Sequence, residues 1–352
     1  MNNILDIFNT KPFSLVEMIK AIEHRPFVPN VLDGMGIFTE KRIRTQDVAI
    51  DFSQRGVKVL ATVPRGGALP TLDDRQKMIR KYSSTRVGES SRLWGTDLQG
   101  LRQLGTTAMQ KAVAQEVGER QSDIIDDIDT TREHRMLGAV SGLVLDKDGS
   151  TIMNWANEFR NATEMGGTGT IPTVTWNLTP ANEGDFRKQA EGVIRSIRTA
   201  LGGISTNKTK IMNLCAPDFY DAVKSLPEVR EQYRNQERAY YVKSSSSDST
   251  DVFDSFEYPA GMIWKDYRGT DDGTSVAVPQ GTCKTFPINT KGVFLEVITP
   301  TARLDMIGKK GIRYNPLIIR DLQRNEYVDI EVTTESLFVC SAPHTLRGGD
   351  IQ

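Results

Sequence analysis

The stretch that organises this chain runs from residue 97 to residue 141 and reads DLQGLRQLGTTAMQKAVAQEVGERQSDIIDDIDTTREHRMLGAVS. Its apolar side chains recur at three- and four-residue intervals, the spacing of one helical face. They are Leu98, Leu101, Leu104, Met109, Val113, Val117, Ile124, Ile128, Leu137 and Val140. This is well beyond the globular average of roughly 11–12 residues. We expect one long helix that packs a single apolar stripe against a sheet, with Gly100, Gly105 or Gly118 as the place of any kink.

The chain ahead of this helix is poor in core-forming residues. Residues 1–45 hold one short helix, with Ser14 as N-cap and Glu17 as its capping-box partner, followed by an extended segment. Residues 47–63 alternate as strands do. The stretch 73–92 is polar with a basic bias, and loops beyond about 15 residues are usually functional or disordered. It therefore either meets an acidic partner surface or is solvated.

The chain after the long helix indicates mixed α and β structure. Asp148-Gly149 predicts the turn of a hairpin between residues 143–145 and 150–153. The other predicted elements are a helix at 186–201, a strand at 210–215, a helix at 217–224, a strand within 256–269 and strands at 327–332 and 335–340. This order is typical of the α+β fold class.

The composition argues against several classes of protein. The 352 residues include 44 Lys+Arg and 45 Asp+Glu, a formal net charge of −1, which disfavours a protein whose main task is wrapping nucleic acid. No apolar run approaches the roughly 18 residues of a membrane helix, so no membrane association is expected. Cys215, Cys283 and Cys340 lack CxxC spacing, which suits a reducing cytoplasm.

The motifs of catalysis and metal binding are missing from the sequence. It has no HExxH, GxxxxGK[ST], GxSxG or paired Cys/His zinc spacing, so we expect no cofactor and no metal. The cluster Gly166-Gly167-Thr168-Gly169 is interpreted as a loop. The carboxylates Asp123, Asp126, Asp127, Asp129 and Glu133 could bind a cation, but a solvated helix face is favoured. An unrecognised α/β hydrolytic enzyme stays open as an alternative.

Four segments together resemble a known family. They are 210–224 (KIMNLCAPDFYDAVK), 256–269 (FEYPAGMIWKDYRG), the Leu145–Ser150 hairpin with Asn154-Trp155 beyond it, and 334–343 (TESLFVCSAP). In order and spacing they are similar to the lambda-type major capsid protein E family of tailed bacteriophages, over nearly the whole chain. The resemblance implies the Hong Kong 97-type shell fold.

That fold implies a division of the chain into parts. The expected boundaries are an N-terminal arm at 1–46, an extended β-hairpin loop (E-loop) at 47–96, a peripheral domain at 97–185 with its spine helix at 97–141, an axial domain at 186–311, and C-terminal strands at 312–352 that complete the peripheral domain. An arm and a polar loop with little core of their own then find their packing partners on neighbouring subunits.

The resemblance also implies the function. A major capsid protein is no enzyme; it self-assembles into hexamers and pentamers of an icosahedral shell around double-stranded DNA, which it contacts without sequence readout. Expected partners are further copies of the chain, a scaffolding protein, a portal and a decoration protein. Assembly takes place in the host bacterial cytoplasm and the product is the virion capsid. The alternative within the same fold is an encapsulin-type bacterial nanocompartment shell protein.

Inter-subunit contact is expected between the basic stretch and the acidic part of the long helix. The basic candidates are Arg75, Lys77, Arg80, Lys81, Arg86 and Arg92, and the acidic candidates are Asp123, Asp126 and Asp127. Exposed ion pairs contribute only about 0–1 kcal/mol each. We therefore expect them to set register and salt sensitivity more than stability.

Overall fold

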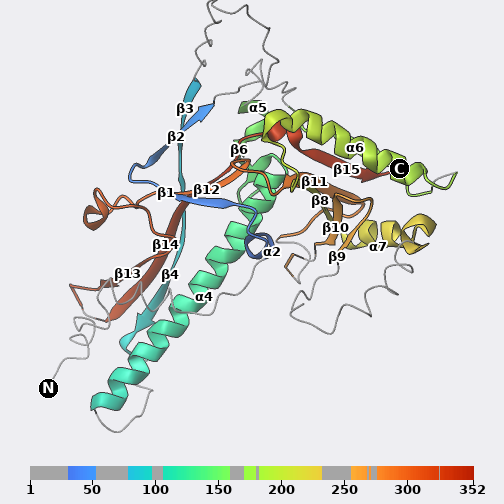
Figure 1. The fold of residues 1–352 in the computed structure, drawn as a ribbon. Helices are drawn as coiled ribbons and strands as arrows, with labels where there is room; N and C mark the ends of the chain where they lie inside the picture. The colour runs from blue at the N-terminus through green and yellow to red at the C-terminus, as the bar shows by residue number, and fades with distance from the viewer. Residues whose placement is uncertain are drawn as a thin grey trace, which may run out of the picture.

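The fold is described from a computed structural model of the chain (Figure 1). The described residues are 31–52, 78–96, 106–158, 170–179, 182–231, 255–267, 269–270, 276–324 and 326–352. The predicted helix that begins near Ser14, the Gly166–Gly169 cluster and the contact candidates Arg75 and Lys77 lie outside these ranges. Among the described helices, none has the length and apolar character needed to cross a membrane.

Helix α4, Thr106–Val140, confirms the long helix over the residues described. It runs as a spine along one side of the molecule (Figure 1). Its apolar stripe packs in three successive clusters: Val117 lies with Ile330, Ile128 lies with Val332, and the last turns join the main core. One face of the helix is thus buried against the protein, and charged residues occupy the remaining, solvent-facing surface.

A five-stranded sheet lies against the spine helix. Its strands are β1 (Thr39–Arg42), β4 (Thr85–Trp94), β12 (Phe294–Ile298), β13 (Asn315–Arg320) and β14 (Tyr327–Cys340). Strand β14 is its centre, because β4, β12 and β13 all pair with it. Six of its 14 residues are β-branched, which suits a pleated surface packed on both sides.

Two hairpins flank this sheet. Strands β2 (Asp47–Phe52) and β3 (Met78–Ser83) are antiparallel, and β3 leads into β4 after one residue. Strands β5 (Leu143–Leu145) and β6 (Thr151–Asn154) form the hairpin predicted at the Asp-Gly turn. Gly149 has a φ of +80° there, a conformation that glycine adopts without strain.

The second sheet has six strands in the order β7-β15-β11-β8-β10-β9. Their bounds are β7 Thr173–Trp176, β8 Lys210–Cys215, β9 Ser255–Glu257, β10 Met262–Asp266, β11 Thr282–Ile288 and β15 Arg347–Ile351. Helices α6 (Asp185–Leu201) and α7 (Pro217–Ser225) lie beside it (Figure 1). Trp264 of β10 is fully buried and its ring contacts Trp176, Phe186 and Phe219. Aromatic packing therefore forms this core.

The strand pairings differ from several sequence expectations. Strand β12 pairs with β14, although it falls within the range 186–311 expected for the axial domain; β7 and β15, expected with the peripheral part, pair in the six-stranded sheet. Strand β4 lies in the range 47–96 expected for the extended β-hairpin loop and pairs within the five-stranded sheet. These pairings are non-local, and no local pattern reports them.

Two local expectations were wrong. Residues 327–340 form one strand and not two, because Thr333 and Thr334 continue the ladder. The strand expected within 256–269 is instead an antiparallel pair, β9 and β10, joined by a turn that contains Pro259 and Gly261. Gly261 has a φ of +96°, which a straight strand does not accommodate.

Candidate functional site: the charged junction of spine, arm and sheet

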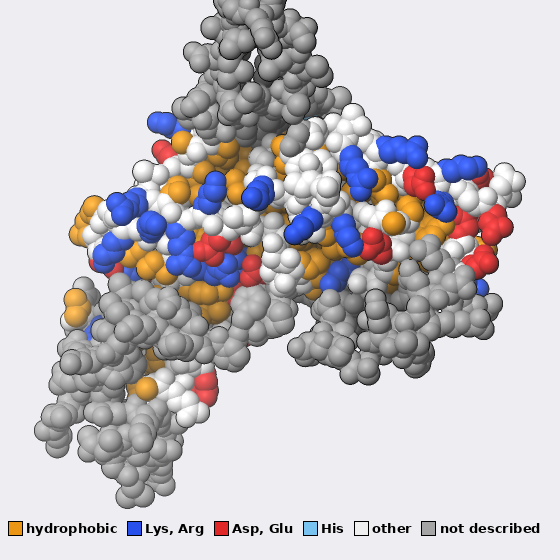
Figure 2. Space-filling model, in the orientation of Figure 1, with side chains coloured by type: hydrophobic (Ala, Val, Ile, Leu, Met, Phe, Trp, Pro, Cys, Tyr) orange, Lys and Arg blue, Asp and Glu red, His pale blue; other side chains and the backbone are white. Residues whose placement is uncertain are grey.

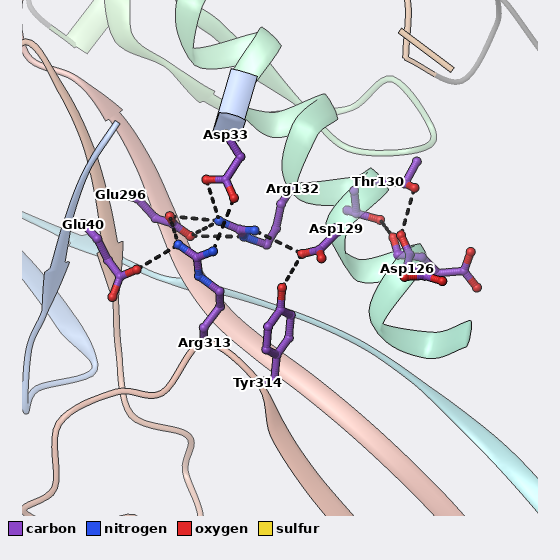
Figure 3. A network of polar contacts seen from close by, with 11 residues as sticks. Asp33, Glu40, Asp126, Asp129, Thr130, Arg132, Glu296, Arg313 and Tyr314 are labelled. Carbon is purple, nitrogen blue, oxygen red and sulfur yellow. Dashed lines mark hydrogen bonds and ion pairs between the residues drawn. The ribbon is translucent and has the colours of Figure 1, made fainter. Parts of the chain in front are cut away.

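A buried arginine joins the spine helix to the five-stranded sheet (Figure 3). The Arg132 guanidinium donates through Nη2 to both carboxylate oxygens of Glu296 on β12, at 2.9 and 3.0 Å. Nη1 donates to Asp129, one turn earlier on the helix, at 3.0 Å. Arg132 is 1 % exposed and Glu296 is 2 % exposed. Charges this deep are tolerated only when paired and hydrogen-bonded, so the two elements are held by directional bonds.

A second arginine, Arg313, connects helix α2 (Val31–Gly34) and strand β1 to the same cluster of charges (Figure 3). Arg313 donates to Glu40 of β1 at 2.8 Å and to Asp33 at 3.3 Å. It also lies 3.5 Å from a Glu296 oxygen, and Arg132 lies 3.6 Å from Asp33. The two guanidinium groups therefore share Asp33 and Glu296, and they tie helix α2 and β1 to the spine.

Glu133 makes a further link at the same level of the spine helix. Its Oε1 accepts the backbone N–H of Leu32 at 2.9 Å and the hydroxyl of Tyr267 at 3.1 Å. Leu32 is fully buried in the main core. Tyr267 directly follows β10, so this carboxylate also reaches the six-stranded sheet. The hydroxyl of Tyr314 donates to Asp129 at 2.6 Å. We call the set Asp33, Glu40, Asp129, Arg132, Glu133, Tyr267, Glu296, Arg313 and Tyr314 the charged junction.

The electrostatics of the charged junction follow from its burial. Burial alone would lower the pKa of Arg132, but the carboxylates of Glu296, Asp33 and Asp129 raise it well above its ordinary value. Burial raises the pKa of Glu133 to about 6, against the opposing hydrogen bonds from Leu32 and Tyr267. Arg132 therefore stays charged at any physiological pH, whereas the carboxyl group of Glu133 changes its protonation state near pH 6.

The sequence analysis missed this junction. The expectation was that Asp129 and Glu133 lie on a solvated helix face, but each is only 6 % exposed. Their hydrogen-bond partners, Tyr314 and Leu32, lie more than 100 positions away in the sequence, so local spacing does not predict the burial. One signal was present. The apolar stripe skips from Ile128 to Leu137, and Arg132 occupies the intervening i+4 position of the buried face.

The basic contact candidates make several bonds within their own chain. Arg80 on β3 donates to the carbonyl and carboxylate oxygens of Glu158. Arg92 on β4 makes a two-point bond to Asp329, at 2.7 and 3.0 Å. Lys81 and Arg86 are exposed on β3 and β4. The sequence did not predict these intramolecular partners, since Asp329 lies 237 positions away.

The acidic candidates line one exposed edge of the spine helix. Asp123, Asp126 and Asp127 are all exposed. A side-chain hydrogen bond with Asp127 raises the pKa of Glu89 on β4. The acidic edge and β4 therefore lie side by side in one subunit. Among the described residues, no group of three or more His, Cys, Asp or Glu is placed to hold a metal ion.

Two sheets on one spine helix, with a projecting hairpin and buried ion pairs at their junction, define a structural subunit. The chain belongs to the phage major capsid protein E family, whose model matches residues 14–350. It is thus a shell-forming protein of the virion and not an enzyme, with the α+β fold of Hong Kong 97-type capsids, and it associates with further copies of itself. The family supports a phage shell over an encapsulin-type compartment and over a hydrolytic enzyme.

The structure is similar to several solved phage-type shells at low sequence identity. The mature capsid of bacteriophage PhiM1 shares 10 % identity, with 93 % of this chain and 89 % of that chain covered and a TM-score of 0.46. The cyanophage A-1(L) capsid shares 13 %, with 93 % and 94 % covered and a TM-score of 0.49. The capsid of an empty GTA particle shares 9 %, with 93 % and 92 % covered and a TM-score of 0.49. No protein with a curated description matches the chain.

Proposed function

We propose that the chain builds hexamers and pentamers of an icosahedral head that encloses double-stranded DNA. The observation that carries this proposal is the family match over residues 14–350, which covers the helices and strands of the described residues up to the last residue but one of β15. The division into arm (1–46), extended loop (47–96), peripheral (97–185 and 312–352) and axial (186–311) parts is proposed with it. The pairings of β12, β7 and β15 run across these proposed boundaries.

Charge supports a non-specific contact with packaged DNA. The face seen in Figure 2 carries Lys and Arg side chains in a band across both sheets. On α6, Arg187, Lys188 and Arg195 have side chains 64 %, 79 % and 78 % exposed. Exposed cations of this kind attract a phosphate backbone without reading its sequence.

The contact candidates keep their proposed role between subunits. Lys81 and Arg86 are exposed cations on the hairpin side, and the Asp123–Asp127 edge is an exposed anionic surface. Arg75 and Lys77 are proposed with them from the sequence alone. A scaffolding protein, a portal and a decoration protein are the expected further partners in assembly.

Assembly of the purified chain tests the proposal. We expect closed shells or tubes of regular hexamers and pentamers in negative-stain images, from the chain expressed alone or with its neighbouring gene products, and nuclease-protected DNA in particles from infected cells. A monodisperse monomer under every salt condition, scaffold included, would contradict the proposal. Particles that enclose an enzyme and no DNA would favour the nanocompartment alternative.

A further inference from the structure

The three most exposed large apolar side chains of the described residues lie on two turns of the five-stranded sheet. Leu304 is 88 % exposed and Ile307 is 74 % exposed on residues 303–310, which we call the knob. Leu322 is 93 % exposed on residues 319–324, which with residues 326 and 327 and with Trp94 we call the tip. Single exposed hydrophobic residues are ordinary. Their concentration on two turns of one sheet is the feature that asks for an explanation.

The knob is an ordered turn. Arg303 makes a two-point bond to Asp305, with both contacts at 3.1 Å, and donates to the Pro316 carbonyl oxygen at 3.2 Å. Met306 is 2 % exposed and anchors the turn from inside. Leu304 and Ile307, on either side of Met306, therefore stand in water on a fixed support. An ordered turn loses little conformational entropy when it binds.

A glycine closes the neck of the knob. The Gly311 N–H donates to the Ile43 carbonyl oxygen at 2.9 Å. A Cβ at residue 311 would lie 2.6 Å from the backbone of Thr299, so only glycine fits. The neck is thereby fixed to the segment after β1, and the knob projects from the sheet edge (Figure 1). Apolar and basic side chains gather at that edge of the molecule (Figure 2).

The tip is ordered as well. Asp321 accepts the backbone N–H groups of Gln323 and Arg324 at 3.0 and 3.2 Å, which fixes the turn with Leu322 at its apex. The rings of Trp94 and Tyr327 lie 5.3 Å apart. The backbone N–H of Asp321, the residue before Leu322, donates to the Tyr327 carbonyl oxygen at 3.3 Å, and Tyr327 pairs with Trp94 across the β4–β14 ladder. Leu322 and Trp94, the latter 43 % exposed, therefore belong to the same end of the five-stranded sheet.

The knob and the tip of one chain are separated by a strand. Strand β13, six residues long, runs between them and spans about 17–20 Å at about 3.3 Å per residue. They also differ in charge. The knob has three cationic side chains and one carboxylate, a net charge of +2. The tip itself has two carboxylates and two guanidinium groups; with the strand residues up to 331 and Arg92, which binds Asp329, the balance is four carboxylates against three guanidinium groups, a net charge of −1.

We propose that the knob of one copy docks on the tip of a second copy. The proposal rests on the self-association that the family assigns to the chain. Leu304 and Ile307 pack against Leu322 and Trp94, while Lys309 and Lys310 face a surface with one surplus carboxylate. Knob and tip are different surfaces, so the contact is heterologous and continues from copy to copy until the rotation closes.

Two charged substitutions and a matched control test the knob. Leu304→Glu with Ile307→Glu is expected to raise the subunit concentration needed for particle formation by about tenfold or more, because it places carboxylates against an apolar and acidic surface. Ile204→Glu, on an isoleucine 39 % exposed outside both turns, is the control. Circular dichroism and the unfolding midpoint of each variant establish that it folds.

A disulfide tests the partner surface. The three native cysteines are buried, so oxidation of particles reports only on added thiols. A disulfide needs Cα atoms about 4.4–6.8 Å apart, which knob and tip of one chain do not reach. The variant with Ile307→Cys and Leu322→Cys is therefore expected to give a ladder of covalent oligomers on a denaturing gel, and either single variant at most dimers.

Each outcome decides the proposal separately from the proposed function. Normal particles from the Leu304→Glu, Ile307→Glu variant would overturn the knob as a contact while leaving the shell function intact. Particles of the double cysteine variant that give no ladder would overturn the tip as the partner surface. Failure of the unsubstituted chain and of the Ile204→Glu control to assemble would count against the shell function itself.

Discussion

The charged junction and the six-stranded sheet are both buried, but they are held together by different forces. Around Trp264 the contacts are aromatic and aliphatic. Around Arg132 they are ion pairs and hydrogen bonds to carboxylates on its own helix and on two other elements, β12 and α2. Apolar packing is non-directional and tolerates small shifts, whereas a bidentate ion pair fixes one geometry. The sheet thus supplies stability, and the junction supplies a specific relative position of spine, arm and five-stranded sheet.

The largest expected effect is on the apolar side of this comparison. Trp264→Ala should lower the free energy of unfolding by about 4–5 kcal/mol, since it removes a fully buried indole and leaves a cavity. Denaturant unfolding followed by fluorescence measures this. Ile204→Ala, at a half-exposed position, should change it by less than about 1 kcal/mol. Equal effects of the two substitutions would contradict the aromatic core as the source of stability.

The next effect tests whether the junction supplies geometry and not stability. Arg132→Met should lower the free energy of unfolding by about 3–4 kcal/mol, because it leaves buried carboxylates unpaired. Adding Glu296→Leu to the same chain should recover most of that loss, since a well-packed apolar pair can replace a buried ion pair. A double-mutant cycle measures the recovery. A double variant that is as unstable as Arg132→Met alone would show that the ion pair itself contributes the stability.

A smaller effect depends on pH. Glu133 has a folded pKa of about 6, above its ordinary value of 4.5, so the folded state binds the proton more tightly than the unfolded state. Stability from this group is therefore full below about pH 4.5 and is lost as pH rises through 6. Glu133→Gln should stabilise the chain by about 2 kcal/mol at pH 8, with the difference vanishing near pH 4.5.

The control for that pH series lies on the same helix. Glu119 is exposed, so Glu119→Gln should shift stability equally at both pH values. Unfolding midpoints of the two variants between pH 4.5 and pH 8 provide the comparison. A flat profile for Glu133→Gln would mean that the junction tolerates the charged carboxylate as well as the neutral one.

The smallest effect concerns exposed ion pairs. Glu191 on α6 pairs with Arg187 and Arg195 at 3.0 and 3.2 Å. Glu191→Gln should cost less than about 0.5–1 kcal/mol, and the cost should disappear in 1 M salt. Thermal unfolding at two salt concentrations measures it. A larger, salt-independent loss would erase the distinction between buried and exposed charge drawn above.

Sequence reasoning succeeded where one element carries its own periodicity. The spine helix, the hairpin at Gly149, and helices α6 and α7 all follow from local spacing and turn residues. The family resemblance supplied the fold. Local sequence patterns did not predict the non-local strand pairings. Strand β12 pairs with β14, and β15 pairs with β7, across long stretches of chain.

The charged junction was missed for the same physical reason. Nothing in the neighbourhood of Arg132 announces Glu296, which lies 164 positions away. A charged residue on an apolar stripe tells only that a partner exists, not which one it is. The knob and the tip were equally invisible, because exposure of Leu304 and Leu322 depends on how the sheet ends.

The long register between β4 and β14 has a mechanical consequence. Strand β4, ten residues long, pairs with β14 along its whole length and follows the β2–β3 hairpin after a single residue. A pull on that hairpin along the strand direction loads every hydrogen bond of the register at once, so the bonds must break together. A pull across the strands opens them one after another. The β4–β14 pairing therefore resists a force along the strands, which shears all of its hydrogen bonds together, better than a force across the strands, which unzips them one at a time.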